Sequence, residues 1–213
     1  MGKEWTPIEL LSAPAARVRG RIENFLRSCE AEAAESRTKF WGHKTVTEHI
    51  RGLRSLHPES PFAADENCRR QAEHFDSLGC FVEATKHIPV IYILRDGRAC
   101  IRSKLKRGAN MSPEEAIERW KFGLRVLDAY RQAGTKLLLL KMEDLVSMPE
   151  PTLRAVCDFI GMPYTPMMLN GTTSEIIPVA YRRPHFDVSV LAHDNPPWTT
   201  AIEKELLACG YAV

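Results

Sequence analysis

Two apolar runs of strand length, residues 89–94 and 136–142, constrain the fold of this 213-residue chain more than any other feature. Both runs are continuous rather than alternating, which is typical of parallel strands that are covered on both faces. Helical patterns flank and separate them, so the predicted order is helix, strand, helix, helix, strand, helix. This order predicts an α/β domain with a parallel central sheet, and the sheet is thin because only two strands are evident.

The helices are predicted from apolar spacing and from residues that start and stop helices. Ser112, followed by Pro113, is a strong start signal for a long helix to about residue 133, which Gly134 ends. Thr45 or Thr47 is expected to cap another helix. Further helices are expected over residues 14–35, 68–78, 149–160 and 199–209, with loop composition over 57–67.

The composition fits one folded domain and excludes several classes of protein. A net charge of +2 is too small to predict nucleic-acid binding, and no apolar run approaches the roughly 18 residues of a membrane helix. The six cysteines are scattered without a CxxC pair, which fits neither a zinc site nor a disulfide scaffold. We therefore expect reduced thiols, a cytoplasmic location, no transmembrane segment and no metal.

The stretch "VIYILRDGRACIRS", residues 90–103, places cations where a strand gives way to a helix. Ligands of open α/β sheets lie beyond the carboxyl ends of strands, where free N–H groups of helix N-termini point outward. Arg95 and Ser103 could therefore bind one phosphate together. The alternative is an Arg–Asp pair that stabilises the turn, with Ser103 as an ordinary small helix residue.

This stretch resembles a motif of the sulfotransferases that use 3′-phosphoadenosine 5′-phosphosulfate (PAPS), in which Arg-Asp-x-Arg ends a strand and Ser follows. "WGHKT" (41–45) and "AIERWKFGL" (116–124) are similar to segments that flank this motif in the family. "LLLLKMEDLVSMPEPTLRAVCDFIGMPY" (137–164) is similar to its strand, Glu-Asp-Leu, Pro and helix ending in Phe-x-Gly. The four segments occur in the family's order, and the resemblance spans about residues 38–213.

The resemblance implies a three-layer α/β fold of the P-loop NTPase type and PAPS as donor, with adenosine 3′,5′-bisphosphate (PAP) as product. Arg95 and Ser103 would hold the 3′-phosphate, and Arg182 and Arg183 would lie over it or be solvated surface residues. The domain would cover 1–213, with a helical segment (1–37), a nucleotide-binding core (38–164) and a C-terminal loop and helix (165–213).

The resemblance also gives candidates for catalysis. Lys44 stands where the family carries a Lys near the sulfonate, although a lysine at a helix start can equally be solvated. Glu48 and His49 lie within about a turn of it and are candidate general bases, although each can be an ordinary surface residue. Trp120 and Trp198 are predicted to pack.

The carboxylates near the strand ends allow two interpretations. Asp96, Glu143 and Asp144 are predicted to cap turns or to pair with cations. A catalytic carboxylate pair stays open as the alternative.

One expected motif is missing. The family's phosphate-cradling loop, with its Ser-Gly-Thr-Thr run after the first strand, has no counterpart here, and "NGTT" (170–173) is interpreted as a turn. We therefore expect an N-terminally incomplete or degenerate sulfotransferase, acting on a hydroxyl or amine of a small-molecule or glycan acceptor. The alternative is a noncatalytic binding or scaffold protein; a small-molecule kinase is disfavoured because no Gly-Lys-Ser/Thr occurs. The acceptor and the oligomeric state stay open.

Overall fold

The computed structural model describes residues 14–36, 42–53, 66, 70, 74–107, 110–172 and 196–212. These residues fall into two compact units. The first unit is drawn from Met1–His87 and Asp128–Gly134, and the second from Ile88–Leu127 and Thr135–Val213. The expectation of one domain over residues 1–213 stays a prediction.

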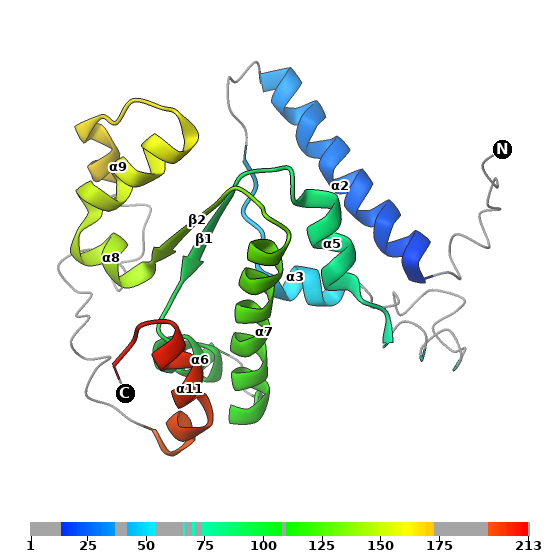
Figure 1. Ribbon diagram of the computed structural model, residues 1–213, viewed down its shortest axis with the longest axis vertical. Coiled ribbons are helices and arrows are strands. Elements are labelled where there is room, and N and C mark those ends of the chain that lie inside the picture. The colour runs from blue at the N-terminus through cyan, green and yellow to red at the C-terminus, as the bar shows by residue number, and fades with distance from the viewer. Residues whose placement is uncertain are drawn as a thin grey trace. The chain divides into compact units, whose positions relative to one another are not determined.

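The first unit is helical. It contains α2 (Pro14–Ser36), α3 (Thr47–Gly52) and α5 (Ser77–Thr85), and α2 runs beside α5 (Figure 1). Val18 and Ile22, one helical turn apart on α2, are fully buried, as expected of an amphipathic helix. The Arg21 guanidinium also donates a hydrogen bond to the Leu53 carbonyl oxygen, at 2.7 Å, which ties α2 to the end of α3.

Two sequence predictions differ from the structure in this unit. The N-cap residue of α3 is Val46, which makes no side-chain cap hydrogen bond, so the prediction that Thr45 or Thr47 caps this helix is wrong. The Thr47 hydroxyl instead donates to Glu48 Oε2 at 3.3 Å. Helix α5 was missed, although Asp76 gives the start signal: its carboxylate accepts a hydrogen bond from the Gly79 N–H at 2.8 Å. Most of the predicted helix over 68–78 lies outside the described residues.

The second unit contains the two predicted strands. Strands β1 (Val90–Leu94) and β2 (Leu137–Lys141) pair in parallel, and the register brings Leu94 opposite Lys141. The carboxyl ends of both strands are therefore level with each other. Helix α6 (Gly97–Arg107) follows β1 after two residues, and α8 (Met142–Ser147) follows β2 directly (Figure 1). The chain is a mostly helical α/β protein, with a two-stranded sheet among the described residues.

The residues of the two strands are less buried than their continuous apolar runs predicted. All five residues of β2 are half-buried, and Ile91 and Ile93 of β1 are exposed. Helices α8 and α9 (Pro149–Ile160) contact β2. Full burial on both faces, as expected for these continuous runs, is thus not observed for either strand.

The remaining elements follow the predicted order. Helix α7 (Pro113–Gln132) begins as expected, because the Ser112 hydroxyl oxygen accepts a hydrogen bond from the Glu115 N–H at 3.2 Å. Gly161, with φ of 70°, ends α9 in the left-handed conformation that favours glycine. The described elements after α9 are the 3₁₀ helices η1 (Pro166–Thr172) and η3 (Pro197–Ile202), and α11 (Glu203–Ala208).

A buried apolar cluster lies next to the end of β1. Its five residues come from α6, α7, η3 and α11, which meet below β1 in Figure 1: Ile101, Ala116, Trp120, Ile202 and Leu206. Trp198 is partly buried against the same cluster, so both predicted packing tryptophans are confirmed. The cluster packs α6, α7, η3 and α11 against one another, next to the residues that link β1 to α6.

Candidate functional site

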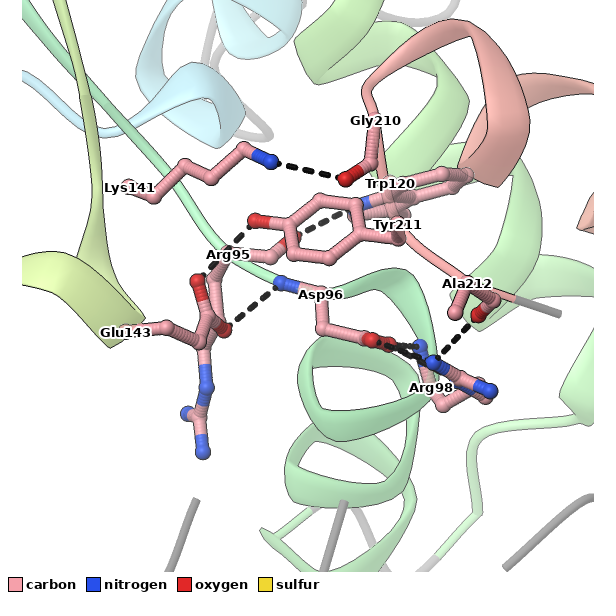
Figure 2. Close-up of polar contacts among 9 residues, drawn as sticks. All are labelled: Arg95, Asp96, Arg98, Trp120, Lys141, Glu143, Gly210, Tyr211 and Ala212. Atoms are coloured by element: carbon pink, nitrogen blue, oxygen red, sulfur yellow. Dashed lines mark hydrogen bonds and ion pairs between the residues drawn. The ribbon is translucent and has the colours of Figure 1, made fainter. Parts of the chain in front are cut away.

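Arg95 and Asp96 link β1 to α6, and together with Gly97 and Arg98, the first two residues of α6, they are called the strand-end turn below. Asp96 and Arg98 form a buried ion pair: Arg98 Nη2 lies 2.7 Å from Asp96 Oδ2, and both side chains are only 4% exposed. Asp96 Oδ1 also accepts hydrogen bonds from the Arg98 N–H at 2.8 Å and from Arg98 Nε at 3.1 Å (Figure 2). Hydrogen bonding to Asp96 raises the pKa of the Arg98 guanidinium.

Asp96 therefore caps the first turn of α6 and neutralises a buried cation with the same carboxylate. This confirms the prediction that Asp96 caps a turn or pairs with a cation. It also shows that the Arg–Asp pair of the alternative interpretation exists and involves Arg98. The pair leaves the role of Arg95 open.

The peptide group between Arg95 and Asp96 is held at both of its polar atoms. Trp120 Nε1 donates to the Arg95 carbonyl oxygen at 3.3 Å, and the Asp96 N–H donates to Glu143 Oε1 at 3.0 Å (Figure 2). Glu143 comes from the first turn of α8, just beyond the end of β2. The level ends of the two parallel strands bring this carboxylate to the strand-end turn.

Residues 210–212, called the C-terminal segment below, contact the same cluster. The Tyr211 hydroxyl donates to Glu143 Oε2 at 3.0 Å, and Arg98 Nη2 donates to the Ala212 carbonyl oxygen at 2.9 Å. Lys141 Nζ donates to the Gly210 carbonyl oxygen at 2.9 Å and lies 4.4 Å from the centre of the Tyr211 ring (Figure 2). Burial and the nearby Glu143 carboxylate raise the pKa of the Tyr211 hydroxyl.

Gly97 is required for packing. A Cβ atom at this position would lie 2.8 Å from Trp120 Cζ2 and 3.0 Å from Ile202 Cδ1. Neither neighbour can move easily, because Trp120 and Ile202 belong to the buried apolar cluster. The glycine thus lets the turn approach the indole ring that also donates to Arg95.

Arg95 and Ser103 are the residues that the sequence predicted to hold a phosphate. Arg95 is half-buried, and its side chain points away from the Asp96–Arg98 pair in Figure 2. Ser103 is half-buried on α6, and its carbonyl oxygen accepts a hydrogen bond from Arg107 Nε at 3.1 Å. Their joint binding of a phosphate stays a prediction.

The remaining candidates lie elsewhere in the chain. Lys44 and His49 are exposed and Glu48 is half-buried; all three belong to the first unit, whereas Arg95 and Ser103 belong to the second. Their catalytic roles stay predictions. Arg182 and Arg183 lie outside the described residues.

The hydrogen bonds made by Glu143 and Tyr211 were not predicted from the sequence. Glu143 was expected to cap a turn or pair with a cation, but its two oxygens accept from a backbone N–H of another element and from Tyr211. Tyr211 itself was not singled out. One signal for the location of Glu143 was its place just after the second apolar run, since the ends of neighbouring parallel strands lie together.

No group of three or more His, Cys, Asp or Glu side chains among the described residues is placed to hold a metal ion. None of the helices that the structure describes has the length and apolar character needed to cross a membrane.

Comparison with known proteins identifies a family. A protein-family model described as "Sulfotransferase family" matches residues 4–166, which is more than half of the chain. No curated protein and no solved structure matches the chain.

Proposed function

Because the chain belongs to the sulfotransferase family, we propose that it binds PAPS and transfers its sulfuryl group to a hydroxyl or amine of a small-molecule or glycan acceptor. The proposed fold is the three-layer, P-loop type of α/β domain that the sequence resemblance implies. The strand-end turn is the observation that carries this proposal. It presents a half-buried guanidinium, Arg95, from a rigid peptide at the carboxyl end of a parallel strand.

The donor site is proposed to begin with the 3′-phosphate. The Arg95 guanidinium can make two parallel hydrogen bonds to phosphate oxygens, and the Ser103 hydroxyl can donate one more. Both oxygens of the Asp96 carboxylate bind the neighbouring Arg98 guanidinium. The chemistry of these groups therefore fits the 3′-phosphate of PAPS and of its product PAP.

The transfer step is assigned to Lys44, Glu48 and His49. The acceptor oxygen or nitrogen attacks sulfur, the bond from sulfur to the bridging phosphate oxygen breaks, and PAP leaves. His49 or Glu48 would take the proton from the acceptor, and Lys44 would stabilise the negative charge that develops on the transferred group and leaving oxygen. Arg182 and Arg183 would add positive charge near the 3′-phosphate.

A noncatalytic nucleotide-independent binding protein is the second candidate. The sequence favours it at one point, because it contains no recognisable loop for the 5′-phosphosulfate. Removing a preorganised donor from such a site typically costs about 3 kcal/mol of transition-state stabilisation, or a hundredfold or more in rate. Binding of the 3′-phosphate and catalysis can therefore be separated.

Cytoplasmic location is also part of the proposal. Cys29, Cys80 and Cys157, among the described residues, are free thiols. Free thiols are typical of proteins in reducing compartments.

Isothermal titration with PAP tests the proposal. We expect the intact chain to bind PAP, and Arg95→Ala to weaken the binding roughly ten- to a hundredfold, as expected for the loss of hydrogen bonds between charged groups. Arg154→Ala, which removes an exposed guanidinium of α9, is the matched control and should leave the affinity unchanged. Absence of PAP binding by the intact chain would favour the noncatalytic candidate.

A further inference from the structure

The Arg95–Asp96 peptide group is fixed from two independent elements. Trp120 of α7 binds its carbonyl oxygen and Glu143 of α8 binds its N–H. Rotation of this peptide would break both hydrogen bonds at once. Because Trp120 and Asp96 are buried, water cannot readily replace the lost partners. The direction in which the Arg95 side chain leaves the backbone therefore depends on these two contacts.

Glu143 is itself held in place by the C-terminal segment. Its second carboxylate oxygen accepts the Tyr211 hydroxyl, and the Tyr211 ring is fixed by Lys141 Nζ. Lys141 also binds the neighbouring Gly210 carbonyl oxygen. The chain of contacts runs from Tyr211 through Glu143 to the peptide next to Arg95, and all of it lies within the second unit (Figure 2).

We propose that Glu143, supported by Tyr211, is a positioning residue for recognition of the donor's 3′-phosphate. Glu143 itself accepts hydrogen bonds from Asp96 and Tyr211; it acts on the ligand through the peptide that carries Arg95. This inference rests on the proposed function and adds to it two residues, one of them in the C-terminal segment. Both oxygens of the Glu143 carboxylate accept hydrogen bonds here, one from the Asp96 N–H and one from the Tyr211 hydroxyl.

Four variants separate positioning from simple support of the fold. Glu143→Ala removes both contacts, Tyr211→Phe removes only the hydroxyl, and Glu143→Gln keeps an oxygen to accept the Asp96 N–H. Glu150→Ala removes an exposed carboxylate of α9 and serves as the control. Each variant is titrated with PAP and with adenosine 5′-monophosphate, which lacks the 3′-phosphate, and exchange of the Asp96 amide hydrogen is followed by NMR.

A positioning role predicts a selective loss. Glu143→Ala should weaken PAP binding roughly five- to tenfold, as expected for one hydrogen bond, and should leave adenosine 5′-monophosphate binding and the stoichiometry unchanged. Tyr211→Phe should weaken PAP binding about twofold, and Glu143→Gln should restore it close to wild type. The Asp96 amide should exchange faster in Glu143→Ala than in Glu143→Gln.

Three results would overturn the inference, and they can be told apart. If Glu143→Ala lowers the stoichiometry or weakens both nucleotides equally, Glu143 only supports the fold. If wild type binds PAP, Arg95→Ala weakens it and Glu143→Ala behaves like Glu150→Ala, the proposed function stands and the positioning role fails. If wild type does not bind PAP, both fail together.

Discussion

The strand-end turn carries Arg95, proposed to bind the 3′-phosphate, and the segment before α3 carries Lys44, proposed for catalysis; the two segments differ sharply in how they are held. In the turn, Asp96 and Arg98 are buried as an ion pair, and side chains bind both polar atoms of the Arg95–Asp96 peptide. Residues 42–46, which include Lys44, are all exposed, and the helix after them begins without a side-chain cap.

This difference indicates where the structure is preorganised. A binding group on a rigid turn loses little conformational entropy when a ligand arrives, whereas an exposed lysine must be ordered by the ligand or by another part of the protein. We therefore expect the second unit to be arranged for recognition of the 3′-phosphate before the nucleotide binds. The contribution of Lys44 should appear only when the reacting group is in place.

The largest effect on the turn should come from Asp96→Ala. The substitution leaves the Arg98 guanidinium buried without its partner, which typically costs about 3–5 kcal/mol of unfolding free energy. Chemical denaturation measures this loss. Glu118→Ala is the matched control: it breaks an exposed ion pair with Arg125 on α7 and should cost at most about 1 kcal/mol. Equal losses in both variants would show that the Asp96–Arg98 pair does not stabilise the turn.

A smaller effect is expected from Gly97→Ala. The added methyl group would overlap the Trp120 ring and press on Ile202, and overpacking of this kind typically costs about 1–3 kcal/mol. The same substitution at Gly20, within α2, meets nothing within 4 Å and should stabilise its helix by about 1 kcal/mol. Thermal or chemical denaturation should thus give opposite signs at the two glycines. A neutral Gly97→Ala would mean that the indole ring can move away from the turn.

The smallest effect concerns pH. Burial and Glu143 raise the pKa of Tyr211, so the hydroxyl stays protonated in the folded chain at pH values where an unfolded tyrosine, with a pKa of about 10, ionises. The stability from this group is fully present below about pH 10 and is lost as the pH rises above it. Tyr130 is shifted in the same direction, also by burial. In denaturation curves, Tyr211→Phe should therefore flatten the decline in stability above pH 10 by up to about 1.4 kcal/mol per pH unit, without abolishing it.

Unchanged steepness in Tyr211→Phe would show that the hydroxyl is not buried against Glu143. Wild type and this variant are sufficient for the comparison. Near neutral pH, the contribution of position 211 to the free energy of unfolding should be nearly independent of pH in both proteins.

Local signals in the sequence were sufficient for most elements of the second unit. The two apolar runs became β1 and β2, Ser112 capped α7, and Gly161 ended α9. Each of these outcomes depends on residues close together in the chain. The prediction that a threonine caps α3 was wrong, because the residue at the N-cap position is Val46, which lies between the two threonines.

The site was less predictable because its contacts join distant parts of the chain. An Arg–Asp pair that stabilises the turn was expected only as an alternative and without Arg98 being named; its two partners, Asp96 and Arg98, lie within two residues of each other. The contact between Tyr211 and Glu143 joins residues 68 positions apart, and that between Arg98 and Ala212 joins residues 114 apart. No local pattern indicates such pairs; they follow from the parallel register and from the packing of α11 against α6 and α7.

The most direct test of the account compares two nucleotides at Arg95. Titration of wild type and Arg95→Ala with PAP and with adenosine 5′-monophosphate gives the preference of each chain for a 3′-phosphate. We predict that wild type binds PAP roughly ten- to a hundredfold more tightly than the monophosphate, and that Arg95→Ala loses most of this preference. If Arg95→Ala keeps the wild-type ratio of the two affinities, Arg95 does not bind the 3′-phosphate and the account is contradicted.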